Sequence, residues 1–215
     1  MSDWRGEGRR SLWYSCGRYR AGVMLDHGAL RIRDLYLFDE NYEEKYLFER
    51  CKKSFCEYRN LPVMDGALYS NKATGLVAGL YFSDNDGKIL WDGVGYSESD
   101  GCATLRAVSK KGSVFISFSE VGIEIRTDVP DLFLLPLCDA SVFSGGEVSA
   151  DEKLVDYNSD DAKISMPSGI FADGDTVKIS FNGREYGVKI ACGTLGDGFC
   201  VYPDDGVIGL SFELY

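Results

Sequence analysis

The sequence contains few of the residues on which metal and nucleophile chemistry usually depends. His27 is the only histidine, and the seven cysteines include no C-x-x-C pair. A Cys/His zinc site therefore has almost no ligands to draw on. The chain also lacks a G-x-S-x-G motif, and its single histidine lies in LDHGAL, a pattern typical of a turn. These absences argue against a serine or cysteine hydrolase.

Positive charge is scarce as well. The chain has 23 Lys and Arg against 34 Asp and Glu, a net charge of −11, which argues against a general nucleic-acid binder. No P-loop or G-x-G-x-x-G motif leads from a strand into a helix, so no nucleotide site is predicted. Seven arginines nevertheless fall in residues 1–33, giving that arm a charge of +4 and leaving −15 on the rest. Two interpretations stay open: the arm packs on its own acidic domain, or it meets an anionic or protein partner.

Long apolar runs are missing too. The N-terminus MSDWRGEGRR has no apolar core of a signal peptide, and no run has the length of a membrane span. We therefore expect a soluble, cytoplasmic protein that does not enter membranes and keeps its cysteines reduced. The alternative is an exported protein whose leader is not part of this sequence, in which Cys192 and Cys200 close a hairpin disulfide.

Turn signals are abundant, and they favour a fold of antiparallel strands. Asp-Gly occurs seven times and Asn182-Gly183 adds a similar turn, and these pairs supply the positive φ angles of tight hairpins. Short strand-like runs such as TVKISF and SVFISF lie between them. With 215 residues, 45% of them hydrophobic, the chain is long enough to bury a core. The sequence predicts a mainly β protein, an antiparallel β-sandwich of jelly-roll type.

Two segments depart from this pattern. Residues 40–57 have acids early, lysines late and helical spacing of apolar residues, which predicts one short helix; a looped crossover between sheets is the alternative. Residues 139–161 are polar and irregular. We expect one domain over residues 1–215 with this segment as an exposed loop, although it also fits a boundary between two strand sets.

The segment SDNDGKILWDGVGYSESDG, residues 83–101, holds the candidate sites. Asp84 and Asp86 have the first spacing of a Ca²⁺ loop, but Gly87 comes too early and Gly95 cannot ligate, so a plain turn explains the same residues. Trp91 and Tyr96 flank a glycine-rich corner beside Asp92 and Glu98. Aromatic rings pack on sugar rings and carboxylates accept hydroxyl protons, so these four residues form a candidate glycan site. Packing in the core or at its rim is the alternative for both rings.

The order of the segments RIRDLYLFDENYEEKYL, NLPVMDG and the closing VIGLSFELY resembles the β-sandwich modules that follow the helical toroid in heparinase II/III-like polysaccharide lyases and related carbohydrate-active enzymes. The resemblance extends from about residue 28 to the end. In those enzymes the catalytic Tyr, His and Arg come mainly from the toroid, so it implies no catalytic residue here. It implies an accessory module.

Three functions follow from these observations. The first is a carbohydrate-associated module, binding or structural, without its own catalytic centre or cofactor. The second is an assembly module that binds a protein or a second copy of itself through a sheet edge or the arginine-rich arm. The third is a small jelly-roll enzyme acting on a glycan, which requires carboxylates of raised pKa in an accessible groove. The sequence contains no cluster of acids that specifies such catalysis.

Overall fold

The computed structural model describes residues 8–39, 50, 61–149 and 163–215. It confirms a mainly β, antiparallel fold, because every pair of neighbouring strands in the described residues runs in opposite directions. The predicted helix at 40–57 lies outside the described residues except for Arg50, which belongs to no helix or strand. Nothing helical in the described ranges has both the length and the apolar character of a membrane span.

One layer of the fold is a nine-stranded sheet. Across the sheet its strands are β1 (Arg9–Ser15), β2 (Tyr19–Asp26), β3 (Ala29–Leu37), β5 (Gly79–Asp84), β11 (Phe133–Leu137), β18 (Val201–Tyr202) and β17 (Thr194–Leu195), with β4 (Leu61–Asp65) paired to β3 and β6 (Gly87–Lys88) paired to β5. The described part of the arginine-rich segment is therefore not a free arm. It forms the first three strands of this sheet.

The second layer is an eight-stranded sheet. Its order is β14 (Gly169–Asp173), β15 (Thr176–Phe181), β16 (Arg184–Cys192), β19 (Val207–Leu214), β10 (Gly122–Thr127), β9 (Gly112–Ser119), β8 (Cys102–Ser109) and β7 (Gly93–Ser99). Strands from both sides of residues 139–161 thus share this sheet. The last strand along the chain, β19, lies between β16 and β10 and joins the two groups.

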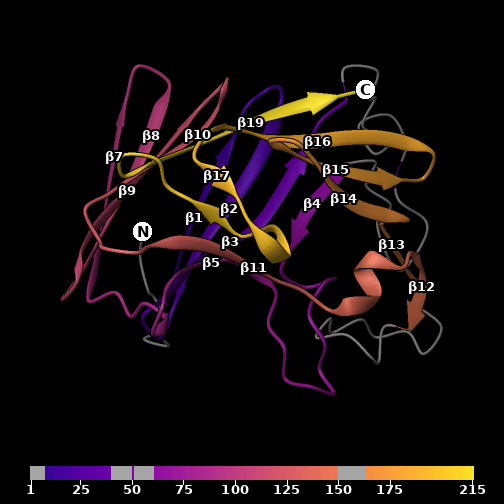
Figure 1. The fold of residues 1–215 in the computed structure, drawn as a ribbon, viewed down its shortest axis with the longest axis horizontal. Coiled ribbons are helices and arrows are strands. Elements are labelled where there is room, and N and C mark those ends of the chain that lie inside the picture. The colour runs from indigo at the N-terminus through magenta and orange to yellow at the C-terminus, as the bar shows by residue number, and fades with distance from the viewer. Residues whose placement is uncertain (1–7, 40–49, 51–60, 150–162) are drawn as a thin grey trace.

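A small hairpin and two short helical turns complete the described structure. The hairpin is β12 (Gly146–Ser149) with β13 (Lys163–Met166), and the 3-10 turns are η1 (Ala140–Phe143) and η3 (Asp197–Phe199). Figure 1 shows the hairpin and η1 together at one end of the molecule, opposite β7 and β8. Cys192 and Cys200, on the two sides of η3, both carry free thiols, so the hairpin disulfide of the exported alternative is not formed.

The turn chemistry expected from the sequence is present in the hairpins. Asp100-Gly101 joins β7 to β8 with φ values of 51° and 75°, and Asn182-Gly183 joins β15 to β16 with 51° and 74°. Positive φ at both central residues is the mark of the type I′ turn, whose twist matches that of the strands it connects. His27-Gly28 makes the same kind of turn between β2 and β3, with φ of 49° and 87°, so the only histidine is a turn residue.

The two sheets seal against each other through alternating apolar side chains. Val114, Ile116 and Phe118 of β9 are fully buried, and Ala21 and Val23 of β2, in the other sheet, belong to the same apolar core. Burial of a side chain of this kind contributes about 1.5–3 kcal/mol. The packing of these faces, one from each sheet, defines the sandwich.

Buried tyrosines tie the layers together by hydrogen bonds. The Tyr19 hydroxyl of β2 lies 2.8 Å from the carbonyl oxygens of both Ser119 and Gly122, at the β9–β10 turn. From the opposite sheet, Tyr186 of β16 donates to the Pro62 carbonyl oxygen at 2.7 Å. Burial raises the pKa of both phenols. Each hydroxyl thus stays a donor and satisfies backbone carbonyls that water does not reach.

Tyr19→Phe removes this bridge without changing the ring. We expect the free energy of unfolding to fall by about 1–3 kcal/mol, because buried carbonyl oxygens lose their donor. Urea unfolding measures the change. The matched control is Tyr96→Phe, whose hydroxyl bonds Glu98 at the surface; equal losses in the two variants would contradict a special role for the buried bridge.

Candidate functional site

The predicted glycan pair, Trp91 and Tyr96, is split between two environments. Trp91 is 3% exposed and its ring packs edge-on to Phe82, with the centroids 6.3 Å apart. Its two ring faces are therefore within the core and not open to a sugar. Tyr96 lies on edge strand β7, is 44% exposed, and donates to the Glu98 carboxylate at 2.6 Å. Asp92 is exposed just before β7. The structure brings Tyr96 and Glu98 together but does not join them to Trp91.

The two aspartates of the predicted Ca²⁺ loop hold a lysine. The Lys111 ammonium lies 2.7 Å from a carboxylate oxygen of Asp84 and 2.7 Å from one of Asp86. The second Asp84 oxygen accepts the Asp86 backbone N–H at 2.9 Å, which closes the turn. The hydrogen bond from Lys111 lowers the pKa of Asp84. The Lys111 ammonium thus lies between the two carboxylates that the sequence predicted as calcium ligands. The described residues contain no group of three or more His, Cys, Asp or Glu side chains that could hold a metal ion.

A different set of polar residues gathers on the outer face of the nine-stranded sheet, and its origin is a β-bulge in β3. Asp34 pairs with Gly22 but Ile32 pairs with Val23, so β3 has one extra residue, Arg33, at this point. After the bulge, the alternate positions that face the core are shifted by one residue. As a result Leu30, Ile32, Leu35 and Leu37 all face the core, while Arg31, Asp34 and Tyr36 face outward.

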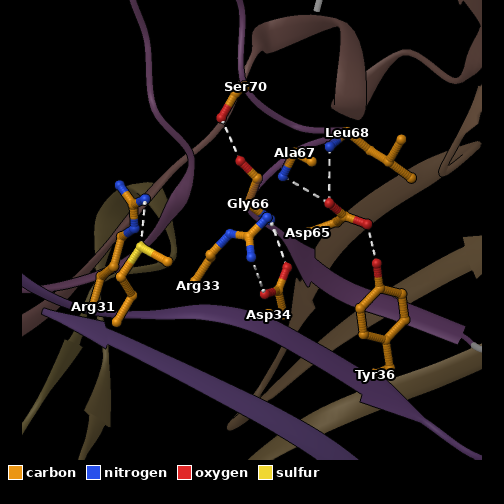
Figure 2. Close-up of polar contacts among 10 residues, drawn as sticks. Arg31, Arg33, Asp34, Tyr36, Asp65, Gly66, Ala67, Leu68 and Ser70 are labelled. Atoms are coloured by element: carbon orange, nitrogen blue, oxygen red, sulfur yellow. Dashed lines mark hydrogen bonds and ion pairs between the residues drawn. The ribbon is translucent and has the colours of Figure 1, made fainter. Parts of the chain in front are cut away.

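Asp34 and Asp65 are the centre of this set, and Figure 2 shows their contacts. They lie opposite each other on β3 and β4 and are only 4% and 6% exposed. Asp34 accepts the Gly66 backbone N–H at 3.1 Å, and its other oxygen lies 3.3 Å from the Arg33 guanidinium. Arg33 lies over Gly66, where an added Cβ would fall 2.3 Å from the arginine side chain.

Asp65 organises the turn that follows β4. One oxygen accepts the backbone N–H groups of Ala67 and Leu68, both at 2.8 Å, and the other accepts the Tyr36 hydroxyl. A few residues on, Ser70 donates to the Gly66 carbonyl at 2.7 Å and accepts from Ala78 N–H at 2.7 Å. The carboxylate therefore fixes the start of the segment that connects β4 with β5.

Burial raises the pKa of both carboxyls. For Asp34 desolvation outweighs the opposing effect of Arg33, and for Asp65 it outweighs the two backbone hydrogen bonds, with the Asp34 charge adding to the rise. Raised carboxyl pKa values are typical of general acids. Here, however, both side chains are enclosed. Three of the four carboxylate oxygens accept hydrogen bonds from the protein, and the fourth, Asp34 Oδ2, has only the 3.3 Å ion pair with Arg33. The arrangement favours a structural role over proton transfer to a substrate.

Next to Asp65 the same face carries an aromatic and cationic stack. The Arg20 guanidinium lies between two rings, 5.5 Å from the centroid of Trp13 and 5.0 Å from that of Tyr36. Gly22 lies beneath the indole, where a Cβ would come 2.9 Å from the ring. Trp13 is 49% exposed, on edge strand β1. We call Trp13, Arg20 and Tyr36 the aromatic platform.

At the other end of β3 lies a hollow of about 260 Å³ that we call the cationic hollow. Its walls come from β2, β3, β5, β6 and the segment around Leu76, and its lining residues are Asp26, Ala29, Arg31, Gly75, Leu76, Val77, Tyr81, Lys88 and Leu137. A second cavity of about 80 Å³ lies among apolar side chains of both sheets, including Leu35, Leu134 and Ile179. The second cavity has few polar groups to orient a ligand, so we place the candidate site on the outer face.

Arg20, Arg31 and Arg33 belong to the arginine-rich segment for which the sequence left a partner open, but Trp13, Asp34, Tyr36, Asp65, Tyr81 and Lys88 were not among the predicted site residues. The sequence does contain one signal, in LRIRDLYL. Its apolar residues occupy the even positions 30 and 32 and then the odd positions 35 and 37, so the side chains expected on the core face shift by one residue. In a regular strand every second side chain faces the core, so such a shift requires a β-bulge. The partners Asp65 and Tyr81 lie far away in sequence, and no local pattern connects them to β3.

Searches with protein-family models, against curated proteins and against solved structures found no match to this chain. The resemblance to modules of polysaccharide lyases therefore stays a prediction.

The raised pKa of Asp34 has a consequence for stability. Above about pH 4 an unfolded chain releases this proton, while the folded protein retains it up to its raised pKa. The native state then binds more protons, so this group lowers the free energy of unfolding as pH rises through that window. Asp34→Asn removes the titration, and we expect the variant to gain stability relative to wild type between pH 4 and pH 7 in urea unfolding.

Asp26→Asn is the control of opposite sign. Desolvation opposes ionisation of Asp26, but hydrogen bonds from His27 and Arg9 prevail and lower its pKa. This carboxylate adds stability above its unfolded pKa, and the contribution is lost as pH falls through the lowered value. The asparagine variant should therefore lose stability relative to wild type as pH rises towards about 4, and the difference should then stay constant up to pH 7. The same slope in both variants would contradict the assignment.

Proposed function

We propose that the chain is a binding module without a catalytic centre of its own, and that it takes a glycan on the aromatic platform of the nine-stranded sheet. The observation that carries this proposal is the half-exposed Trp13 indole beside the Arg20–Tyr36 stack. A flat ring held at a sheet surface offers apolar area, while the neighbouring guanidinium offers hydrogen-bond donors. The combination suits a sugar ring, which has an apolar face and a rim of hydroxyls.

Pre-organisation supports the proposal. Arg20 is held from both sides by rings, Tyr36 is bonded to Asp65, and Gly22 leaves space for the indole to lie close to β2. Side chains fixed before binding lose less conformational entropy when a ligand arrives. The carbohydrate class also agrees with the resemblance described above. Tyr96 with Glu98, on the opposite sheet, remains a separate predicted contact for a glycan.

An assembly function uses the same observation. Exposed Trp and Arg are the residues most often found at the centre of protein interfaces, and Trp13 lies on an edge strand. A protein partner or a second copy of this chain is therefore the competing occupant of the platform. The enclosed Asp34–Asp65 pair gives no comparable support to the enzyme hypothesis.

Trp13→Ala tests the platform. We expect glycan affinity to fall about tenfold or more, equivalent to about 1.4 kcal/mol, because the apolar contact with the sugar ring is lost. A glycan array identifies the ligand and titration calorimetry measures the affinity. Tyr96→Ala is the matched control, since its ring is exposed to a similar extent on the other sheet.

The outcomes separate the alternatives. Loss of binding in Trp13→Ala alone supports the platform, whereas loss in Tyr96→Ala alone transfers the glycan site to β7. Wild-type protein that binds no glycan, and that changes from dimer to monomer with Trp13→Ala in light scattering, would establish assembly instead.

A further inference from the structure

The cationic hollow holds two positive side chains around one aromatic ring. Arg31 of β3 and Tyr81 of β5 are direct cross-strand partners, and Lys88 of β6 approaches the same ring. The Arg31 guanidinium carbon lies 5.5 Å from the Tyr81 ring centroid, and the Lys88 ammonium lies 4.0 Å from it. The two cations therefore share one small space, separated from the aromatic platform by the bulge.

Arg31 is a buried cation whose hydrogen bonds go only to neutral groups. It is 6% exposed, and its terminal nitrogens contact the Tyr81 hydroxyl at 2.5 Å and the Met24 sulfur at 3.6 Å. The buried Nε has no hydrogen-bond partner in the described part of the chain. Within the same residues no carboxylate lies at ion-pair distance from Arg31. A buried guanidinium without an anion is unfavourable, since its charge has lost water and gained no counter-charge.

Lys88 is also without a carboxylate partner among the described residues. Desolvation lowers the pKa of its ammonium, and the positive charge of Arg31 lowers it further. The ring of Tyr81 compensates part of this cost through its π face. Its hydroxyl is already committed, accepting from Arg31 and donating to the Val77 carbonyl at 3.0 Å.

The nearest acid does not neutralise the pair. Asp26 lines the hollow, but its carboxylate accepts from Arg9 at 3.1 Å and from His27 Nδ1 at 2.6 Å. The positive charge of Arg31 also lowers the pKa of Asp26, although the two side chains form no ion pair within the described residues. In a protein with a net charge of −11, the hollow thus gathers two positive side chains that have no ion-pair partner among the described residues.

We propose that the cationic hollow is a binding site for a doubly charged oxyanion, phosphate or sulfate, held between Arg31 and Lys88. A dianion matches the two unpaired cations in charge. Its oxygens are acceptors for the second N–H group of each terminal Arg31 nitrogen, beyond the bonds to Tyr81 and Met24, and for the N–H donors of the Lys88 ammonium. A volume of about 260 Å³ has room for such a group, since one water molecule takes about 30 Å³ of liquid volume. Leu76, Val77 and Leu137 form an apolar wall of the hollow, while Lys88 itself is exposed to solvent.

Titration with sodium phosphate and sodium sulfate, against sodium chloride at matched ionic strength, tests the site. We expect phosphate or sulfate to bind and to raise the melting temperature, and chloride to do neither. Lys88→Gln should weaken binding at least tenfold, because one of the two charges is lost, while Lys88→Arg should retain it. Lys110→Gln is the matched control, an exposed lysine outside the hollow.

Glucose 6-phosphate and glucose, used as further probes, distinguish a phosphate carried by a small molecule from the free ion. Tighter binding of glucose 6-phosphate than of inorganic phosphate supports an esterified ligand, and the reverse supports the free ion. Equal phosphate affinity in wild type and Lys88→Gln would overturn the proposal, as would equal stabilisation by phosphate and chloride. Trp13→Ala should leave phosphate binding unchanged, so failure of the glycan proposal and failure of this one are separate results.

Discussion

The outer face of the nine-stranded sheet depends on one constraint: β3 keeps two pairs of apolar residues in the core, Leu30 with Ile32 and Leu35 with Leu37, although two charged residues separate the pairs. Strict alternation from Leu30 would put Asp34 inside the sandwich and Leu35 outside. The extra residue at Arg33 resolves the conflict. It also sets the spacing of what faces outward: Arg31 towards β5, Asp34 towards β4, and Tyr36 towards Arg20. The core and both candidate sites therefore share one local irregularity.

Polar side chains in this protein are buried with specific partners, and the partners differ by layer. Between the sheets, tyrosine hydroxyls donate hydrogen bonds to backbone carbonyl oxygens of the opposite sheet that are buried away from water. On the outer face, carboxylates accept backbone N–H groups and shape the segment after β4. Buried Ser83 Oγ and Trp91 Nε1 depart from this pattern, since they have no hydrogen-bond partner in the described residues. Buried Arg31 and exposed Lys88 share the Tyr81 ring and form no ion pair in the same residues. The absence of an ion pair at these two cations is what favours an anionic ligand in the cationic hollow.

Much of the architecture followed from the sequence, because turns and alternation are local. Asp100-Gly101 and Asn182-Gly183 specify hairpins through their own backbone preferences. In TVKISF the alternation of apolar and polar side chains indicates a strand whatever its neighbours are. The site did not follow, because it is made by cross-strand neighbours. Tyr81 meets Arg31 across fifty positions, and Trp13 is set beside Tyr36 by an intervening strand. Trp91 was predicted as a ligand residue because it lies in an acidic, glycine-rich segment. Its ring is instead buried in the core, which the local sequence did not indicate.

The position of β19 bears on how the protein is made. Because this strand is the last along the chain and sits between β16 and β10, the eight-stranded sheet stays in two unjoined parts until residues 207–214 leave the ribosome. Each part meanwhile presents an open row of amides and carbonyls to other nascent chains. Such late, long-range closure slows folding and exposes intermediates to aggregation. Two unpaired strand edges, on β16 and β10, therefore persist until β19 is inserted between them.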